Sequence, residues 1–266
     1  MISFSSITSA SAAADYYSGI DKAAEYYAGE GRVPSRWIGS GAALQGLRGA
    51  VRDADGQQRQ LGIQRGGEFQ HRCGWDFTVS APKSVSIEAL VNGRADVDNA
   101  HRKSVAAAVA YLEKHAATAR INGQFVATGN LTAAVYEHVS SRAGDPQLHS
   151  HVLIANVTHD SQGRARSVSN EKLLEHRKSA DSIYPQTLSR ELQALGYAVR
   201  HDRQRHVEIA SYTREQLADF STRSREIEAA LAARGQTREG ASAESRQIAA
   251  LATRSPKNLP ETREVY

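Results

Sequence analysis

Three histidines, His138, His149 and His151, lie within one short stretch of the chain. Residues two apart on a strand point to the same face, so His149 and His151 would lie side by side if this stretch is extended. Neutral imidazole suits first-row divalent metals, and three protein ligands with open positions are typical of catalytic metal sites. The pattern indicates a metal site; the alternative is a His-x-His pair that is merely solvated or hydrogen-bonded.

The segments around these histidines have the composition of two strands. Residues 132–140 and 148–157 are rich in β-branched and apolar residues, and the Ala-Gly-Asp-Pro sequence at residues 143–146 is a turn signal between them. This arrangement predicts an antiparallel β-hairpin. In a register whose paired residue numbers have an odd sum, His138 shares a face with the other two histidines, and the three imidazoles converge.

Two tyrosine pairs near the N-terminus, Tyr16-Tyr17 and Tyr26-Tyr27, are candidate nucleophiles. Tyrosine has a reference pKa of about 10, so at pH 7 only about one phenol in a thousand is ionised, a deficit of about 4 kcal/mol. A metal that holds a target phosphate, or a carboxylate that takes the phenol proton, can offset much of this deficit. The alternative role for these tyrosines is ordinary packing.

Asp76 is the candidate carboxylate. It lies in an otherwise apolar strand candidate, Gly-Trp-Asp-Phe-Thr-Val at residues 74–79. A carboxylate in such surroundings is unfavourable unless it has a partner, and a cationic or metal-bound histidine would be one. A structural hydrogen bond to a backbone turn is an equally good explanation from composition alone.

Other elements must position these residues, and hydrophobic periodicity predicts them coarsely. The predicted strands and hairpin are residues 2–7, 75–80 and 197–209. The predicted helices are residues 8–18, 97–119 and 171–195, the last interrupted at Pro185. Residues 40–67 are polar and glycine-rich and are expected to form loops, whereas the chain from residue 213 onward is predicted to be a helical arm.

Composition sets the outer bounds. A chain of 266 residues fits one large domain, and its formal charge of +4 favours an anionic partner such as nucleic acid. Cys73 is the only cysteine, so an intramolecular disulfide is excluded. No apolar stretch approaches the about 20 residues needed to cross a bilayer, and the start lacks the features of a signal peptide. A cytoplasmic location is expected.

Three blocks of this sequence, taken together, resemble the relaxase domain of the MobF conjugative relaxases. They are the tyrosine pairs, Gly-Trp-Asp-Phe-Thr-Val-Ser-Ala-Pro-Lys-Ser-Val-Ser at residues 74–86, and Glu-His-Val-Ser-Ser-Arg-Ala-Gly-Asp-Pro-Gln-Leu-His-Ser-His at residues 137–151. The match runs in order to about residue 200 and weakens over the helical arm. The wider group of HUH endonucleases is named for two histidines around a hydrophobic residue, and here Ser150 takes that middle position.

The resemblance implies a single-strand DNA endonuclease and strand transferase that starts plasmid transfer. Tyr16 would attack the scissile phosphate at the nic site of the transfer origin, giving a 5′-phosphotyrosyl linkage and a free 3′-hydroxyl. Tyr26 would serve the later transfer that recloses the strand. Tyr17 and Tyr27 are the alternatives within each pair.

The resemblance also implies roles for the remaining site residues. His138, His149 and His151 would hold a divalent cation, Mg²⁺ or Mn²⁺, with Zn²⁺ as the alternative. Asp76 would orient one of these histidines or accept the tyrosine proton. Lys83 and Arg142 would contact phosphates, or else have a structural or solvated role.

The fold implied is α+β, a central antiparallel β-sheet covered by helices, with residues 1–210 as the catalytic core and residues 211–266 as a C-terminal helical arm. Single-stranded plasmid oriT DNA, with its nic site and adjacent hairpin, would be the main partner. Relaxosome accessory proteins and a type IV coupling protein would be others, in a bacterial, plasmid-encoded setting. The helicase domain that follows in most members of the family is absent from this chain.

Two other functions remain as alternatives. The first is an origin-binding module that recognises hairpin DNA without cutting it and keeps the metal site as a remnant. The second is a metal hydrolase of cupin-like type acting on small molecules. It would use the three histidines but would leave the tyrosine pairs and the Ser-Ala-Pro-Lys-Ser block without a purpose.

Overall fold

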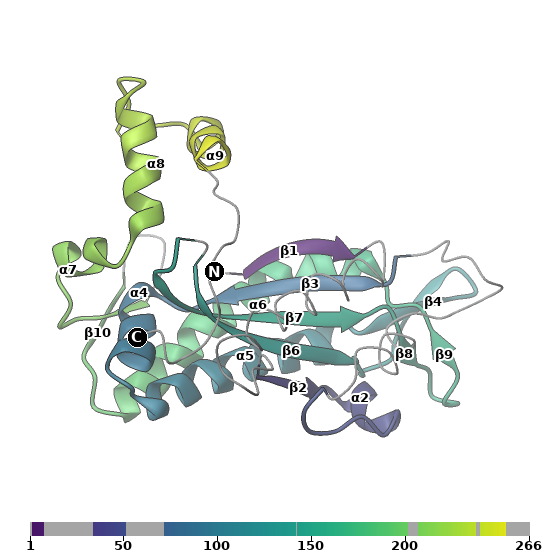
Figure 1. Cartoon of the computed structure of the whole chain (residues 1–266). Coiled ribbons are helices and arrows are strands. Elements are labelled where there is room, and N and C mark those ends of the chain that lie inside the picture. The colour runs from purple at the N-terminus through teal and green to yellow at the C-terminus, as the bar shows by residue number, and fades with distance from the viewer. Residues whose placement is uncertain are drawn as a thin grey trace.

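The computed structural model describes residues 2–7, 34–51, 72–141, 143–201, 207–237 and 240–253. These residues form an α+β fold around a central five-stranded sheet in which every neighbouring pair is antiparallel. The strand order is β1 (Ile2–Ile7), β3 (Gly74–Ser80), β7 (Pro146–Ala155), β6 (Ala133–Ser140) and β2 (Ser35–Ile38). Figure 1 shows the five strands side by side.

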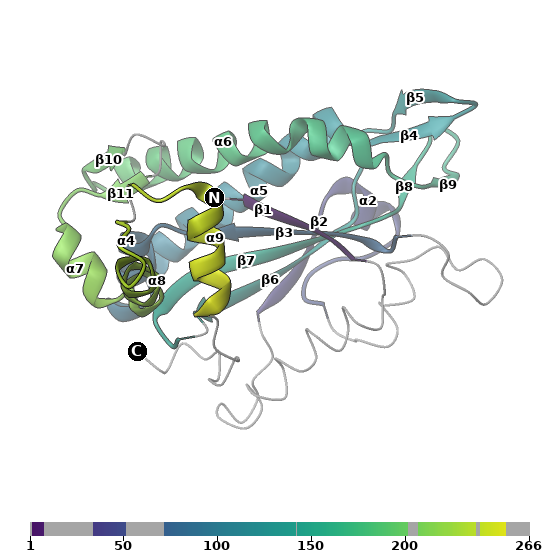
Figure 2. The same ribbon diagram turned by 90° about the horizontal axis from the view of Figure 1, so that it is seen from above.

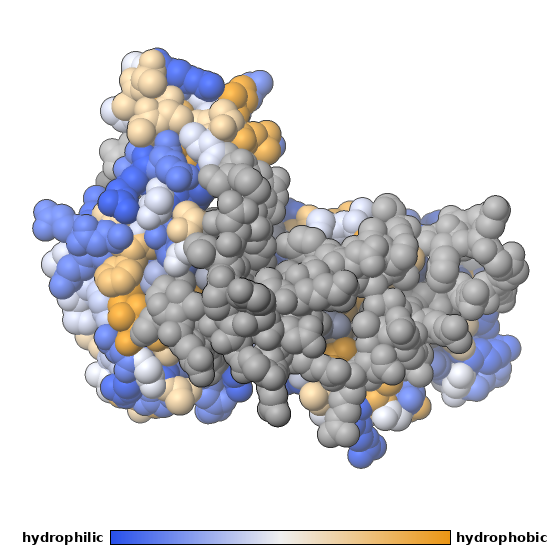
Figure 3. All heavy atoms as spheres, viewed as in Figure 1, coloured by the Kyte–Doolittle hydropathy of each residue, from blue (hydrophilic) through white to orange (hydrophobic). Residues whose placement is uncertain are grey.

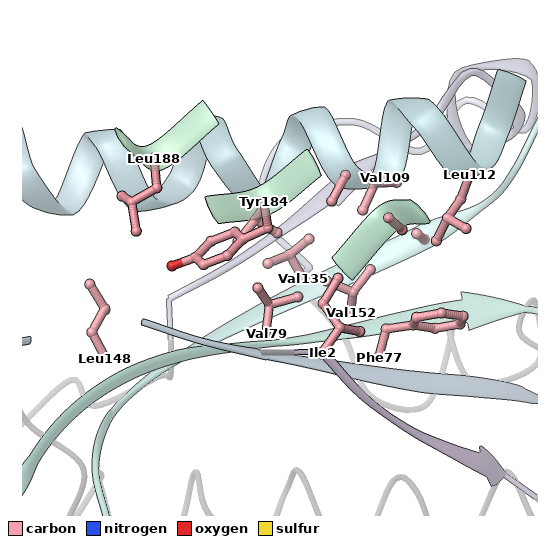
Figure 4. Close-up of a cluster of buried hydrophobic side chains, with 14 of the residues drawn as sticks. Ile2, Phe77, Val79, Val109, Leu112, Val135, Leu148, Val152, Tyr184 and Leu188 are labelled. Carbon is pink, nitrogen blue, oxygen red and sulfur yellow. The ribbon is translucent and has the colours of Figure 1, made fainter. Parts of the chain in front are cut away.

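Two long helices, α5 (Ala95–Ala116) and α6 (Asn170–Ala194), cover one face of this sheet, as Figure 2 shows. Alternate residues of β3 point toward them: Trp75, Phe77 and Val79 are almost fully buried in the main core. Figure 4 shows Phe77 and Val79 facing side chains of the two helices, among them Leu112 of α5 and Tyr184 of α6. The residues between them on β3, including the candidate carboxylate Asp76, therefore face the opposite side of the sheet.

Smaller elements surround this core. The short helices α4 (Lys83–Ser86) and η1 (Ile87–Val91) connect β3 to α5. Among the described residues, three two-stranded ribbons lie outside the main sheet: β4 (Thr118–Ile121) with β5 (Gln124–Ala127), β8 (Thr158–His159) with β9 (Ala165–Arg166), and β10 (Val199–His201) with β11 (Val207–Ile209). None of the described helices is long and apolar enough to span a membrane.

The chain after β11 forms a helical arm. It consists of α7 (Arg214–Asp219), α8 (Thr222–Ala232) and α9 (Ala243–Ala252), and it projects beside the end of the sheet where β7 begins (Figure 1). Leu231 and Ala249 form a small core between α8 and α9. Apolar surface gathers over α9 (Figure 3), where Ile248 and Leu251 are exposed. The predicted arm is thus confirmed in its described part.

Most of the expected elements are present. The strands predicted at residues 2–7 and 75–80 are β1 and β3, and the hairpin around the histidines is β6 and β7. The hairpin expected at residues 197–209 is the β10–β11 ribbon. The helix expected at residues 97–119 is α5, which begins and ends slightly earlier. The helix expected at residues 8–18 lies outside the described residues.

The expected interruption at Pro185 is wrong, because α6 continues unbroken through this residue. Proline inside a helix removes one backbone hydrogen bond and costs about 3 kcal/mol. Tyr184 and Leu188 flank it and are fully buried in the main core. Burying two large side chains stabilises the helix by about as much as the proline costs, or more. Tertiary packing therefore overrides the local signal.

The expectation of loops for residues 40–67 is wrong at its start, where α2 (Ser40–Leu44) forms. The backbone N–H and the hydroxyl of Ser40 donate to Glu113 Oε1 of α5, at 2.7 and 2.9 Å. A distant residue thus satisfies the first turn of this short helix, which no local pattern could reveal. Residues 52–67 lie outside the described residues.

Gly74, the first residue of β3, is required by the close approach of β7. A Cβ atom on this residue would lie 2.3 Å from the backbone carbonyl oxygen of Ile154. Backbone atoms of a central strand cannot move aside as a flexible side chain can, so the two strands would have to separate locally.

We therefore expect Gly74→Ala to lower the free energy of unfolding by about 1–3 kcal/mol, the usual cost of overpacking a well-packed site. Urea denaturation followed by circular dichroism measures this change. An unchanged midpoint would show that the approach of β7 to β3 is not as close as described.

Candidate metal centre

The register of the β6–β7 hairpin brings the three histidines together. His138 pairs directly with His149, and Tyr136 pairs with His151. The paired residue numbers have an odd sum, the register in which the three histidines share a face, so all three imidazoles lie on the face of the sheet opposite α5 and α6. A shift of register follows His138. Such bulges are common beside active sites, because they re-aim a side chain.

The spacing of the three rings fits a shared metal ion. Their centroids are 5.1 Å apart for His138 and His149, 4.9 Å for His138 and His151, and 5.3 Å for His149 and His151. A metal–nitrogen bond of about 2.1 Å in tetrahedral geometry places imidazole centres about 5 Å apart. The backbone thus already sets the separation that three nitrogen ligands need.

The rings have the spacing of a metal site, but they are not oriented as one. No group of three or more His, Cys, Asp or Glu side chains within the described ranges is arranged as a ready metal site. The rings of His138 and His149 are tilted by only 25° from each other, a stacked arrangement. Rotation of a ring about its side-chain bonds requires no backbone movement, so the spacing of the centroids can be kept while the rings turn. Ion binding at this face would need such rotations.

Hydrogen bonds fix the tautomer of two of these histidines. Nδ1 of His149 lies 2.9 Å from the carbonyl oxygen of Gln147, and Nδ1 of His151 lies 2.8 Å from Oδ2 of Asp76. A carbonyl or an ionised carboxylate only accepts, so Nδ1 carries the proton in both rings. In the neutral rings Nε2 then holds the lone pair. This is the usual arrangement of metal-binding histidines, whose second nitrogen donates to a carbonyl or carboxylate.

Asp76 reaches His151 from the neighbouring strand. On β3, Thr78 pairs with His151 and Ser80 pairs with His149, so Asp76 lies on the same face, two residues from Thr78. Its side chain is 13% exposed. The structure therefore brings together Asp76, His138, His149 and His151. Asp76 thus has a histidine partner in the structure, and its catalytic role stays a prediction.

Thr78 belongs to this group and was not singled out from the sequence. Its hydroxyl lies 3.1 Å from Nδ1 of His151 and 3.4 Å from both carboxylate oxygens of Asp76. It can donate to the carboxylate and help to hold it against the ring. The period of two along β3 was the available signal, because a residue two positions after Asp76 must share its face.

Lys83 lies at the turn of the hairpin. Its Nζ donates to the backbone carbonyl of Pro146 at 2.9 Å. Burial lowers the pKa of Lys83, and the nearby carboxylates of Asp145 and Glu208 partly oppose this shift. The contact is the one expected for the structural alternative, since it ties α4 to the start of β7. Contact with a phosphate stays a prediction.

The other predicted site residues, Tyr16, Tyr17, Tyr26, Tyr27 and Arg142, lie outside the described residues. Their roles stay predictions from the sequence.

Comparisons with known proteins identify the family. The model of the TrwC relaxase family matches residues 10–266. The multifunctional conjugation protein TraI of Escherichia coli is 36% identical over 288 residues, covering 99% of this chain and 16% of that protein. The chain therefore spans only a small part of the length of this relative.

Solved structures agree. A metal-bound structure of the conjugative relaxase TrwC in complex with oriT DNA has a TM-score of 0.85 and 34% identity, covering 100% of this chain and 94% of that chain. TrwC complexed with a 27-mer DNA comprising the recognition hairpin and the cleavage site has a TM-score of 0.82 and 33% identity, covering 99% and 94%. These findings confirm the resemblance seen in the sequence: the chain belongs to the TrwC relaxase family.

Proposed function

We propose that this chain is the DNA-nicking domain of a conjugative relaxase, which cuts and rejoins one strand of a plasmid transfer origin by tyrosine transesterification. The observation that carries the proposal is the convergence of three imidazoles and one carboxylate on a single sheet face, in a chain of this family. The TrwC structures in complex with oriT DNA support single-stranded oriT DNA, with its nic site and hairpin, as the substrate.

The arrangement of the fold suits a strand of DNA. The three histidines lie near the end of β6 and in β7, and the helical arm projects beside the end of the sheet where β7 begins (Figure 1). We assign residues 1–210 to the catalytic core and residues 211–266 to the arm. The arm would close over DNA bound at the sheet face that carries the three histidines. The net charge of +4 favours such an anionic substrate.

The chemical step would exchange one phosphodiester for another. The phenol oxygen of Tyr16 gives up its proton and attacks the scissile phosphorus, the bond from phosphorus to the 3′ oxygen breaks, and the leaving oxygen takes up a proton as a 3′-hydroxyl, so that no net proton is released. The product is a 5′-phosphotyrosyl linkage, so the energy of the phosphodiester is retained and the step is reversible. Tyr26 would act in the later transfer that recloses the strand.

His138, His149 and His151 would hold the divalent ion. When bound, the ion supplies Lewis-acid stabilisation of the charge that develops on the phosphate oxygens. Three neutral nitrogens suit first-row transition ions better than Mg²⁺, which prefers oxygen ligands. Among the ions expected from the sequence, the donor set therefore favours Zn²⁺ most and Mg²⁺ least, with Mn²⁺ between them.

Asp76 would orient His151. Its carboxylate accepts from Nδ1 of that ring at 2.8 Å, which places the lone pair of the neutral ring on Nε2. This contact favours the orienting role over direct acceptance of the Tyr16 proton. A cytoplasmic location, relaxosome accessory proteins and a type IV coupling protein stay predictions from the sequence.

We expect Tyr16→Phe to abolish the covalent protein–DNA adduct, because phenylalanine lacks the attacking oxygen. The chain is incubated with Mn²⁺ and a single-stranded oligonucleotide that carries the cognate transfer origin, and the products are separated on a denaturing gel. The adduct of the unaltered chain should also disappear with a chelator.

Tyr17→Phe is the matched control and should keep the adduct. Loss of the adduct in Tyr17→Phe alone would move the nucleophile to the neighbouring residue. Tight binding of the oligonucleotide by the unaltered chain, with no adduct under any metal, would instead support the origin-binding module that does not cut.

We expect Asp76→Asn to weaken Mn²⁺ binding by about 10- to 100-fold, the usual effect of removing a carboxylate that orients a metal-binding histidine. Asparagine can present its amide nitrogen to Nδ1 and thereby favour the other tautomer. Isothermal titration calorimetry with Mn²⁺ measures the change directly, without relying on nicking activity.

Asp96→Asn is the control, since Asp96 forms an exposed ion pair with Arg94. Its Mn²⁺ affinity should equal that of the unaltered chain. Equal affinity in Asp76→Asn would remove the orienting role from Asp76.

A further inference from the structure

The face of the β6–β7 hairpin that points toward α5 and α6 carries two buried polar residues, on the side opposite the three histidines. Glu137 precedes His138 and pairs across the strands with Ser150, which lies between His149 and His151. Both side chains point toward the helices, and they are 4% and 0% exposed. A sheet face that packs on helices ordinarily carries apolar residues at such positions.

Two consecutive residues of α5 hold this pair. His101 Nε2 lies 3.0 Å from Ser150 Oγ, and Arg102 forms an ion pair with Glu137 at 2.7 Å. Arg36 of β2 also pairs with Glu137. Each strand of the hairpin is therefore attached to α5 at the position next to a metal-site histidine.

His101 extends the attachment to the second helix. Its Nδ1 lies 2.7 Å from the hydroxyl of Tyr184 on α6, so the ring bridges Tyr184 and Ser150. His101 is 0% exposed, and burial lowers its pKa to about 3. In the neutral ring one nitrogen donates and the other accepts, so both contacts are directional. Figure 4 shows Tyr184 within the surrounding apolar core.

The contacts of His101 are directional, so they constrain the register of the hairpin more tightly than apolar packing would. A slip of one residue between β6 and β7 would turn all three histidines to the wrong face. A ligand set also has to be held to within about 0.5 Å, which requires support from residues behind it. A buried hydroxyl without its partner costs about 1–3 kcal/mol, so the alignment that keeps the contacts is favoured.

We propose that His101 is a positioning residue of the metal centre: through Ser150 it fixes β7 from behind and thereby holds His149 and His151 in the geometry that binds the ion. The inference rests on the proposed metal site. The ion pair of Arg102 with Glu137 joins β6, the other strand of the hairpin, to the same helix.

Co²⁺ is the probe for the test, because its visible absorption reports the coordination geometry and a titration gives its affinity. The variants are His101→Phe, which keeps a ring but removes both contacts, and Ser150→Ala, which removes one oxygen atom. We expect each to weaken Co²⁺ binding by about 5- to 10-fold and to change the absorption bands, less than the loss of a group bonded directly to a ligand. Ser150→Thr keeps the hydroxyl and should restore binding.

A double variant sharpens the test. If His101 acts through Ser150, then His101→Phe combined with Ser150→Ala should bind Co²⁺ no more weakly than the worse single variant. Lys103→Ala is the matched control. Lys103 follows Arg102 on α5, but it forms an ion pair with Glu191 at 2.9 Å on the outer side of the helices. It should leave affinity and spectrum unchanged.

The opposite results are equally clear. Lower melting temperatures with unchanged Co²⁺ affinity and spectrum would mean that His101 and Ser150 only stabilise the core, and would overturn the proposal. Additive losses in the double variant would do the same. Absence of Co²⁺ binding by the folded, unaltered chain would overturn the metal site itself. Ser150→Ala keeps the test valid if His101→Phe does not fold.

Discussion

The pairing of His138 with His149 across β6 and β7 is the constraint on which the site depends. Side chains alternate along a strand, so this one register places three imidazoles on the same face and Glu137 and Ser150 on the other. The site is therefore a property of strand pairing before it is a property of any single side chain. The neighbouring strand β3 completes it, because its pairing with β7 places Asp76 beside His151.

The two faces of the β6–β7 hairpin differ in the side chains that they carry and in the partners of those side chains. One face carries the imidazoles that we propose as metal ligands, and the carbonyl of Gln147 and the carboxylate of Asp76 define the tautomers of two of them. The other face must bury its side chains against α5 and α6, yet it carries Ser150 at the centre of the paired histidines. His101 satisfies that hydroxyl from the helix side. The site thus has polar partners both at its ligands and behind them.

The helices that support the sheet are determined more by packing than by local preference. Pro185 does not break α6, because Tyr184 and Leu188 of the same helix are buried in the core and the gain from that burial is larger than the loss of one backbone hydrogen bond. Likewise α2 begins where a carboxylate of α5 satisfies Ser40. Both departures concern elements whose stability comes from contacts distant in sequence.

The sequence by itself determined the candidate ligands, the hairpin that carries them and the family, because strand periodicity, turn residues and contiguous motifs are local properties. It also indicated that Asp76 needs a partner. Only the tertiary structure decided that this partner is His151, that Thr78 joins them, and that His101 of α5 contacts Ser150, because these contacts join residues far apart in the chain. Their positions follow from which strands and helices pack together, which no local pattern records.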